Sequence, residues 1–335
     1  MAFGHEAPQQ HTQPDGASAH TLAFLKAWDT PGLALDWDDE TRTITSWLTH
    51  EDRPAMTPQV MAAHHELLTG LQRNSWAGCD WFRFYVNRAR SAKVYSYGGD
   101  FAFMLRVAET RDATAMGKYG KMCIQAIHKL IEGLGDRTIS IAAVGGTCLG
   151  GGLEGAVAHD FVVAERGKKM GLPEGNIGMF PGAGAYSMLS RKIGRRETER
   201  LITKAAYFTT DEAHEMGMVD HLCDAGQIET GIRELQEEIT PRFNTYLSTV
   251  RARRRCAEIT MTEMQAVIDD WVDAGMNMEA HHLMLMRHLL AQQDANARRA
   301  AEKARAEAAG GEVVAMDGGE VPASKTNPFR AHADA

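Results

Sequence analysis

Short apolar runs alternate with amphipathic stretches along most of the chain. The run 139–144, ISIAAV, is apolar and short, which is typical of a buried strand. The stretch 101–134 instead carries an apolar stripe at Ile124, Ile127 and Leu130, which predicts one or two amphipathic helices. The pattern predicts strands at 33–37, 43–47, 81–86, 92–97 and 139–144, and helices at 58–71, 101–134, 152–159, 185–193, 197–204 and 280–309.

Polar residues mark where several of these helices begin. Thr57-Pro58 combines a capping residue with proline at the first helical position. Thr209–Glu212 and Thr260–Glu263 both fit a capping box. Asp100 could act in chemistry, but the favoured interpretation is a cap for the helix that follows it. Strand–helix alternation followed by helices alone indicates an α/β core with a helical C-terminal region. The expected organisation is a disordered segment 1–20, an α/β core 21–240, a helical region 241–309 and a flexible tail 310–335.

The most informative stretch, 141–183, reads as a strand, a glycine turn, a short helix, a strand and a second turn. Glycines 150–152 let the backbone bend freely and let a ligand approach it closely. The free N–H groups at the start of the following helix favour negative charge, such as that of an oxyanion. Glu154 falls in the first turn of this helix, and Glu174 follows Pro173 in the second turn. The stretch therefore predicts an oxyanion hole with acid/base residues beside it.

The same glycines also satisfy the dinucleotide-binding pattern, as Gly150-x-Gly152-x-x-Gly155. That interpretation fails on charge, because Glu154 in the first helical turn would face the pyrophosphate and repel it. The motif also lies in the middle of the chain rather than after a first strand.

Composition argues against several classes of protein but does not indicate a function. The 335 residues are 44% hydrophobic and 24% charged, and the net charge of −8 gives no general reason to expect nucleic acid. The apolar runs are too short for a membrane span, and no secretory signal is visible at the N-terminus. The five cysteines form no CxxC pair, which predicts reduced thiols in a cytoplasmic protein.

The segments AVGGTCLGGGLE and MGLPEGNIGMFPGAGA resemble the signature of the crotonase (enoyl-CoA hydratase/isomerase) superfamily. The resemblance assigns one oxyanion-hole N–H to Gly151. The other falls in the loop 95–100, YSYGGD, on Gly99 by position, with Gly98 as the fallback. The two catalytic glutamates of the family map onto Glu154 and Glu174.

Within that superfamily the chain is most similar to the bacterial diffusible-signal-factor synthases, through SYGGDFAFML, AERGKKMGLPE, FPGAGAYSMLSRKIG and WVDAGMNM. The resemblance implies a spiral of ββα turns and a C-terminal helical part that covers the site and builds trimers or a dimer of trimers. It implies an acyl-CoA or acyl carrier protein thioester as substrate, with no metal or redox cofactor.

Three residues are candidates for the substrate pocket: Tyr97, Trp271 and Met276. Tyr97 could narrow the acyl pocket, whereas the Met-rich segment 276–286 is either core packing or a pliable wall for an acyl chain. The basic run 251–255 is either a solvated face or a contact for CoA phosphates or an acidic carrier protein. The pairs His64-His65 and His281-His282 lack metal-ligand spacing, so structural or surface roles are expected.

The resemblance to the signal synthases implies a dehydratase and thioesterase that converts a 3-hydroxyacyl thioester to a cis-2-unsaturated fatty acid signal. Two glutamates that share a water or hydroxyl can eliminate water, one at the α carbon and the other at the β-hydroxyl. The alternatives are an ordinary enoyl-CoA hydratase or isomerase, and a regulatory protein that uses the same fold to bind a signalling partner.

Overall fold

The computed structural model describes residues 30–49, 53–76, 82–135 and 137–308, together with Leu25 and Trp28. The larger sheet in this part of the chain has six strands in the order β1-β2-β3-β5-β7-β10. Strand β1 pairs antiparallel with β2, and every other neighbouring pair is parallel. The strands are β1 (Leu33–Asp38), β2 (Thr43–Leu48), β3 (Phe84–Ala89), β5 (Ile139–Val144), β7 (Phe161–Glu165) and β10 (His221–Cys223).

A second sheet contains four short strands in the order β4-β6-β8-β9. Strands β4 (Val94–Ser96), β6 (Thr147–Leu149) and β8 (Lys169–Gly171) are parallel to each other, and β9 (Tyr207–Thr209) is antiparallel to β8. Each of the first three follows a strand of the larger sheet, β3, β5 or β7, and precedes helical structure. The chain therefore repeats a ββα turn, as the family resemblance implied. Strands β6 and β8 were not predicted, because three residues are too few to show a period.

Helices connect these turns and then form the C-terminal region. The helix caps predicted at Thr57, Asp100 and Thr209 are confirmed, with side-chain acceptors for N–H groups of the first turn. At Thr260 only the threonine half of the box is recorded, and Glu263 pairs with Arg191 instead. The helices are α2 (Pro58–Trp76), α3 (Phe101–Glu109), α4 (Ala113–Glu132), α5 (Gly151–Val157), α6 (Ala185–Lys192), α7 (Arg195–Thr203), α8 (Thr210–Glu215), α9 (Ile228–Ile239), α10 (Phe243–Cys256), α11 (Met261–Met276) and α12 (Ala280–Ala308), with 3₁₀ turns η1 (Pro173–Ile177) and η2 (Thr240–Arg242).

Some predicted boundaries were wrong by a few residues. The strand expected at 81–86 is β3, which begins at Phe84, and Trp81 lies outside the described residues. The strand expected at 92–97 shrinks to the three residues of β4 and belongs to the second sheet. The expected disordered segment 1–20 and flexible tail 310–335 both lie outside the described residues.

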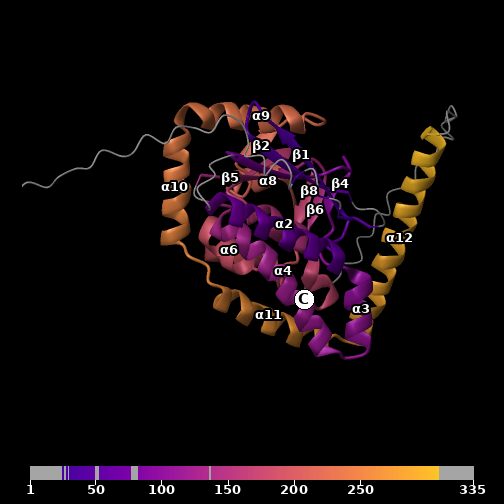
Figure 1. Ribbon diagram of the computed structural model, residues 1–335. Helices are drawn as coiled ribbons and strands as arrows, with labels where there is room; N and C mark the ends of the chain where they lie inside the picture. The colour runs from indigo at the N-terminus through magenta and orange to yellow at the C-terminus, as the bar shows by residue number, and fades with distance from the viewer. Residues whose placement is uncertain are drawn as a thin grey trace, which may run out of the picture. The chain divides into compact units, whose positions relative to one another are not determined.

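Strand β5 is buried on both faces, which confirms the prediction from its apolar run. Ile139, Ile141 and Ala143 pack in a cluster with residues of α9 and α10, while Ala142 and Val144 pack in the main core with residues of α2 and α4. The sheet therefore lies between α9 and α10 on one side and α2 and α4 on the other (Figure 1). Burial on both faces explains why β5 reads as a continuous apolar run rather than an alternating one.

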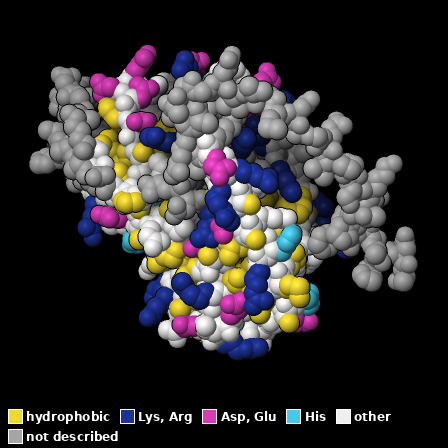
Figure 2. All heavy atoms as spheres, turned by 90° about the vertical axis from the view of Figure 1, so that its right-hand side faces the viewer, with side chains coloured by type: hydrophobic (Ala, Val, Ile, Leu, Met, Phe, Trp, Pro, Cys, Tyr) yellow, Lys and Arg dark blue, Asp and Glu magenta, His cyan; other side chains and the backbone are white. Residues whose placement is uncertain are grey.

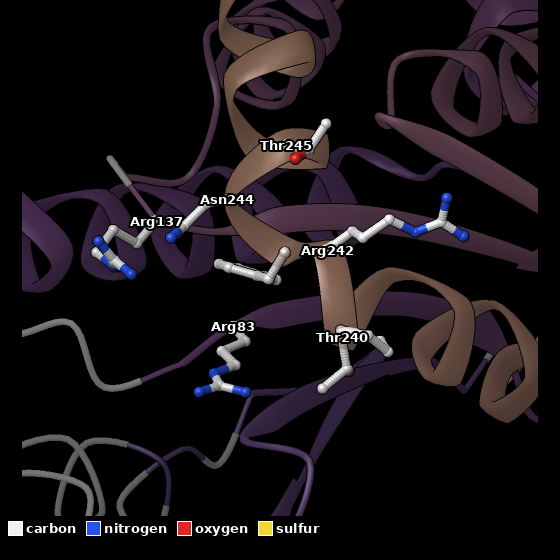
Figure 3. Close-up of a pocket in the computed structure, with 8 residues that line it drawn as sticks. Arg83, Arg137, Thr240, Arg242, Asn244 and Thr245 are labelled. Carbon is white, nitrogen blue, oxygen red and sulfur yellow. The ribbon is translucent and has the colours of Figure 1, made fainter.

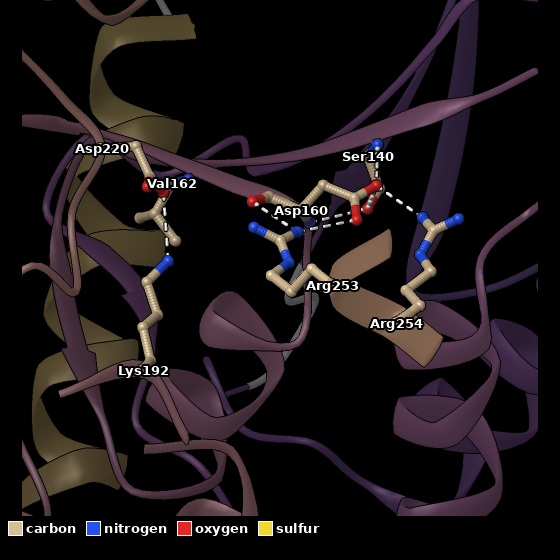
Figure 4. A network of polar contacts seen from close by, with 7 residues as sticks. All are labelled: Ser140, Asp160, Val162, Lys192, Asp220, Arg253 and Arg254. Atoms are coloured by element: carbon tan, nitrogen blue, oxygen red, sulfur yellow. Dashed lines mark hydrogen bonds and ion pairs between the residues drawn. The ribbon is translucent and has the colours of Figure 1, made fainter. Parts of the chain in front are cut away.

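Helix α10 is tied to the sheet by a buried carboxylate. Asp160, immediately before β7, accepts hydrogen bonds from Arg253 (3.1 Å) and Arg254 (2.7 Å) and from the backbone and hydroxyl of Ser140 (Figure 4). Two arginines of the basic run 251–255 therefore form a structural ion-pair network that the sequence did not predict, while Arg255 is exposed as expected of a solvated face.

Helix α12 spans two compact units. Its residues up to Ala291 belong with the preceding chain, and those from Gln292 onward belong to a second unit. No helix in the described ranges is long and apolar enough to cross a membrane. On the face drawn in Figure 2, basic and acidic side chains are interspersed with hydrophobic ones.

Candidate active site

Two glycine loops from different turns of the spiral meet at the second sheet. One loop follows β4 and contains Gly98 and Gly99, and the other follows β6 and contains Gly150 and Gly151. A Cβ atom added to Gly98 would lie 2.7 Å from the backbone nitrogen of Gly151, and one added to Gly151 would lie 3.5 Å from the nitrogen of Gly99. Gly98 also has φ +91°, a conformation that other residues rarely adopt. This approach of the two backbones requires glycine.

The N–H groups of Gly99 and Gly151 donate no hydrogen bond within the described part of the chain. The N–H of Gly98, in contrast, donates to Ser96 Oγ at 3.0 Å. Gly151 is the first residue of α5, where the helix dipole adds positive potential. Gly99 and Gly151 are therefore the pair available to an incoming oxygen, and the fallback residue Gly98 is already occupied.

Two residues that the sequence did not indicate hold these loops in place. The Tyr119 hydroxyl donates to the carbonyl of Met56 (2.5 Å) and accepts from the N–H of Asp100 (3.1 Å), which fixes the end of the first loop. A Cβ atom on Gly152 would lie 2.7 Å from Ser96 Cβ, so β4 packs directly against the start of α5. Ser96 could have been suspected as the polar residue just before the glycine pair, but no local signal identifies Tyr119, which comes from α4.

Both predicted glutamates lie at this junction, Glu154 fully buried and Glu174 half-buried with its carboxyl oxygen Oε2 out of contact with solvent. Glu154 lies on α5, is only 2% exposed, and accepts a hydrogen bond from the N–H of Ala185 at 2.9 Å. Glu174 lies on the 3₁₀ turn η1, and a Cβ atom on Gly150 would lie 2.5 Å from its Oε1. Its Oε2 atom is buried and has no hydrogen-bond partner among the residues that the structure describes. A buried carboxylate oxygen with no partner is unusual, and a site that holds substrate accounts for it.

Burial controls the protonation of both carboxyl groups. Burial raises the pKa of Glu154 to about 7, although the N–H groups of Ala185 and Ala183 act in the opposite direction by stabilising the carboxylate. Burial, together with the negative charge of Glu154, raises the pKa of Glu174 to about 8. Near neutral pH these raised pKa values therefore favour retention of a proton by the pair, and an ionised Glu154 favours the protonated form of Glu174.

This pair should make stability depend on pH. Since both pKa values in the folded state lie above the unfolded value, the folded chain keeps protons that the unfolded chain loses. The stabilising contribution is complete below about pH 4.5 and is lost as the pH rises through about 7 to 8. We expect the double substitution Glu154→Gln/Glu174→Gln to reduce the fall in unfolding free energy between pH 5 and pH 8, measured by urea titration. If the double variant loses as much unfolding free energy between pH 5 and pH 8 as the unmodified chain, the pKa values of these two carboxyl groups are not raised in the folded state.

The three predicted pocket residues differ in whether they lie near the glycine loops and the glutamates. The carbonyl of Tyr97 lies beside Gly150, and its side chain is half-buried. Trp271 lies against Gly182. Gly182 belongs to the loop between Glu174 and the N–H groups of Ala183 and Ala185, which bind Glu154. The carbonyl of Met276 accepts a hydrogen bond from Arg111, so this contact joins it to the start of α4 rather than to the glutamates.

The core-packing interpretation of the Met-rich segment 276–286 holds for some of its methionines and not for others. Met278 and Met286 are buried, whereas Met284 is 65% exposed.

Two other side chains lie near the carboxyl groups and were not predicted. Desolvation raises the pKa of the Cys123 thiol, and the negative charge of Glu154 adds to the shift; desolvation also raises the pKa of Tyr207, and the negative charge of Glu174 adds to it. Lys169 lies over the Tyr207 ring at 3.6 Å. These residues come from α4, β8 and β9, so their proximity to the glutamates depends on the tertiary fold.

His64 and His282, one from each histidine pair, make packing contacts within the fold. His64 is buried and contacts Asn87 at 3.3 Å, and His282 packs against Gly178. Across the described ranges no group of three or more His, Cys, Asp or Glu residues is arranged to hold a metal ion.

The arrangement of ββα turns, two meeting glycine loops and a helical C-terminal region defines a protein of the crotonase fold. The family model described as enoyl-CoA hydratase/isomerase matches residues 88–268, more than half of the chain. The chain therefore belongs to the enoyl-CoA hydratase/isomerase family.

Comparisons with individual proteins agree with this assignment. A crotonyl-CoA hydratase from Syntrophomonas wolfei is 32% identical over 149 residues, which cover 44% of this chain and 54% of the relative. The match thus spans about half the length of that relative. The crystal structure of an enoyl-CoA hydratase from Bacillus halodurans has a TM-score of 0.66 at 15% identity, covering 76% of this chain and 98% of the other. Human mitochondrial delta3-delta2-enoyl-CoA isomerase has a TM-score of 0.64 at 18% identity, covering 79% and 99%.

Proposed function

We propose that this protein is a lyase that adds water to, or removes water from, the α,β carbons of an acyl thioester. The observation that carries the proposal is the pair of carboxyl groups, with Glu154 buried and Glu174 holding a buried oxygen, beside two backbone N–H groups that donate no hydrogen bond to described residues. The similarity to a crotonyl-CoA hydratase supports a CoA thioester as the substrate class. Carrier protein thioesters present the same acyl group and belong to the same proposal.

The protonation states suggest the roles of the two glutamates. In the direction of hydration, ionised Glu154 takes a proton from water, whose oxygen bonds to the β carbon. Protonated Glu174 then donates its proton to the α carbon. In the reverse direction each group carries out the opposite transfer, so that a β-hydroxyl leaves as water and the double bond forms.

The backbone N–H groups would stabilise the charge that develops on the thioester oxygen. When the α carbon gains or loses its proton, the electron pair of the enolate resides on that oxygen. Two preorganised donors in a site shielded from water bind the enolate more strongly than the ground-state carbonyl. Gly99 and Gly151 are the donors in this proposal.

A second candidate adds a hydrolytic step and is the signal-synthase activity. It rests on the resemblance of SYGGDFAFML and WVDAGMNM to the diffusible-signal-factor synthases. After dehydration, water attacks the thioester carbonyl, the C–S bond breaks, the thiol leaves with a proton, and a 2-unsaturated fatty acid is released. The same two N–H groups would stabilise the tetrahedral oxyanion.

One set of reactions distinguishes the two candidates. The purified chain is incubated with a 2-enoyl-CoA and, separately, with a 3-hydroxyacyl carrier protein, and the products are identified by mass spectrometry. Reversible hydration without free acid supports the hydratase, whereas release of a 2-enoic acid supports the signal synthase. Absence of any water addition, elimination or thioester cleavage would contradict the lyase proposal and favour a binding role.

The loop geometry gives a further prediction. We expect Gly98→Ala to lower kcat about 100-fold, because its Cβ atom would lie 2.7 Å from Gly151 N and 2.9 Å from Leu149 O and would displace one donor. Gly155→Ala is the matched control on α5, since no atom lies within 4 Å of its added Cβ. Steady-state kinetics measures both, and equal activities would contradict the assigned donors.

Assembly is a further part of the proposal. The family resemblance implies a trimer or a dimer of trimers built through the helical region, in a cytoplasmic protein. Light scattering of the purified chain measures its mass directly, and a monomer at working concentration would contradict this part alone.

A signalling-protein partner would still be captured by the inactive Glu154→Ala/Glu174→Ala variant.

A further inference from the structure

The peptide group between Gly98 and Gly99 is held by the segment that precedes α2. Met56 forms a parallel β-bridge with Gly99, and the Met56 N–H donates to the carbonyl of Gly98 at 2.8 Å. In a trans peptide the carbonyl and the N–H that follows it point in opposite directions. The bond from Met56 to Gly98 therefore directs the Gly99 N–H away from Met56.

The Tyr119 hydroxyl completes this attachment on the other side of Gly99. It accepts from the N–H of Asp100 at 3.1 Å and donates to the carbonyl of Met56 at 2.5 Å. The peptide group before Gly99 is thus tied to Met56 directly, and the one after it is tied to Met56 through a single hydroxyl. Neither peptide group can rotate without breaking one of these hydrogen bonds.

Tyr119 itself has little freedom to move. Its side chain lies on α4 and the residue is 3% exposed. The ring packs against Phe103 of α3, with centroids 4.9 Å apart, and against Trp271 of α11 at 6.3 Å. Helix α4 packs against both of these helices (Figure 1). Burial raises the pKa of the Tyr119 hydroxyl well above its ordinary value, so it stays protonated and able to donate to Met56.

A polar hollow at the opposite ends of the strands takes no part in this arrangement. It has a volume of about 330 Å³ and is lined by Arg83, Arg137, Thr240, Pro241, Arg242, Phe243, Asn244 and Thr245 (Figure 3). It lies where β3 and β5 begin, whereas the loops with Gly99 and Gly151 follow the ends of those strands. A six-residue strand is on the order of 20 Å long, so the hollow does not contact the loops.

We propose that Tyr119 is a positioning residue that fixes the direction of the Gly99 N–H toward the thioester oxygen. This inference rests on the proposed function, in which that N–H receives the oxygen. Tyr119 acts through Met56 and Asp100 and does not touch the substrate. Without the hydroxyl, the Met56 carbonyl and the Asp100 N–H lose the partner that joins them, and the donor at Gly99 is no longer held in one direction.

Tyr119→Phe tests the proposal, because it keeps the ring and removes only the hydroxyl. We expect kcat with a 2-enoyl-CoA to fall about 10- to 100-fold and KM to change less than about twofold, since the donor acts mainly on the developing charge. Tyr85→Phe is the matched control. Tyr85 is 1% exposed, and its hydroxyl hydrogen-bonds to Ser46 at 2.8 Å on β2, so the control also loses a buried hydroxyl. It should retain full activity.

A binding measurement separates the direction of the donor from the stability of the chain. A 3-ketoacyl-CoA ionises to an enolate with charge on its thioester oxygen, and the ultraviolet absorbance of the enolate reports how much of the bound ligand has ionised. We expect Tyr119→Phe to raise the pH of half-ionisation by about 1–2 units, which corresponds to the same loss of about 10- to 100-fold. The affinity for a saturated acyl-CoA, which carries no such charge, should change less than about twofold.

Phe103→Leu is a second variant, which keeps the hydroxyl but removes one ring that holds Tyr119 in place. We expect it to lower kcat about threefold or more and to shift the ionisation in the same direction. Unchanged ionisation in folded Tyr119→Phe, or in Phe103→Leu if the first variant does not fold, overturns the proposal. So does an equal loss in Tyr85→Phe, or an unmodified chain that does not ionise the ligand. An unmodified chain that ionises the ligand but turns over no thioester contradicts the proposed function and leaves the role of Tyr119 supported by the shift.

Discussion

Replacing Glu174 by glutamine is expected to lower kcat for water addition or elimination by about 1,000-fold. The amide keeps the shape of the side chain, but it cannot donate an acidic proton to the α carbon or take one from it. General acid–base catalysis contributes about 10²–10⁴ in rate, and Glu174 has a buried oxygen without a hydrogen bond to any described residue. Steady-state kinetics with a 2-enoyl-CoA measures the loss.

Replacing Glu154 by glutamine should lower kcat by a similar factor, because no carboxylate then takes the proton from the attacking water. A glutamine oxygen can still accept the N–H of Ala185, so the loop with that residue should keep its position. Glu237→Gln, on the exposed side of α9, is the matched control and should retain full activity. Full activity in the double variant Glu154→Gln/Glu174→Gln would exclude the proposed mechanism.

The largest effect on stability is expected from Asp160→Ala. Its carboxylate is buried between Arg253 and Arg254, and both arginines would lose their partner. Breaking a buried ion pair by removing one partner costs about 3–5 kcal/mol. Urea unfolding of the purified variant measures the change in unfolding free energy.

Asp220→Ala is the natural comparison, since both networks are drawn in Figure 4. Asp220 binds Lys192 at 3.1 Å and the N–H of Val162 at 2.8 Å, but its side chain is 27% exposed. We expect a loss of about 1–2 kcal/mol, because water can replace part of these interactions. A loss at Asp160 no larger than that at Asp220 would mean that α10 is not held by the buried network.

Sequence patterns correctly predicted the features that depend only on residues close together in the chain. The apolar run of β5 requires only that both faces be buried, and the caps at Asp100 and Thr209 act on N–H groups two or three residues away. The prediction failed where the partner is distant. Arg254 could not be distinguished from a solvated arginine, because its partner Asp160 lies 94 positions earlier in the sequence.

The chain by itself determined which chemical groups are present and where the backbone can bend. Glycines at 98 and 150–152 permit close approach, and glutamates at 154 and 174 supply the ionisable groups, because these properties belong to single residues. Only the tertiary structure decided that the two loops touch, that the Gly98 N–H is occupied while that of Gly99 is open, and that burial raises both carboxyl pKa values. It also placed the Tyr119 hydroxyl between Met56 and Asp100. Those properties depend on desolvation and on distances between segments that only the folded chain brings together.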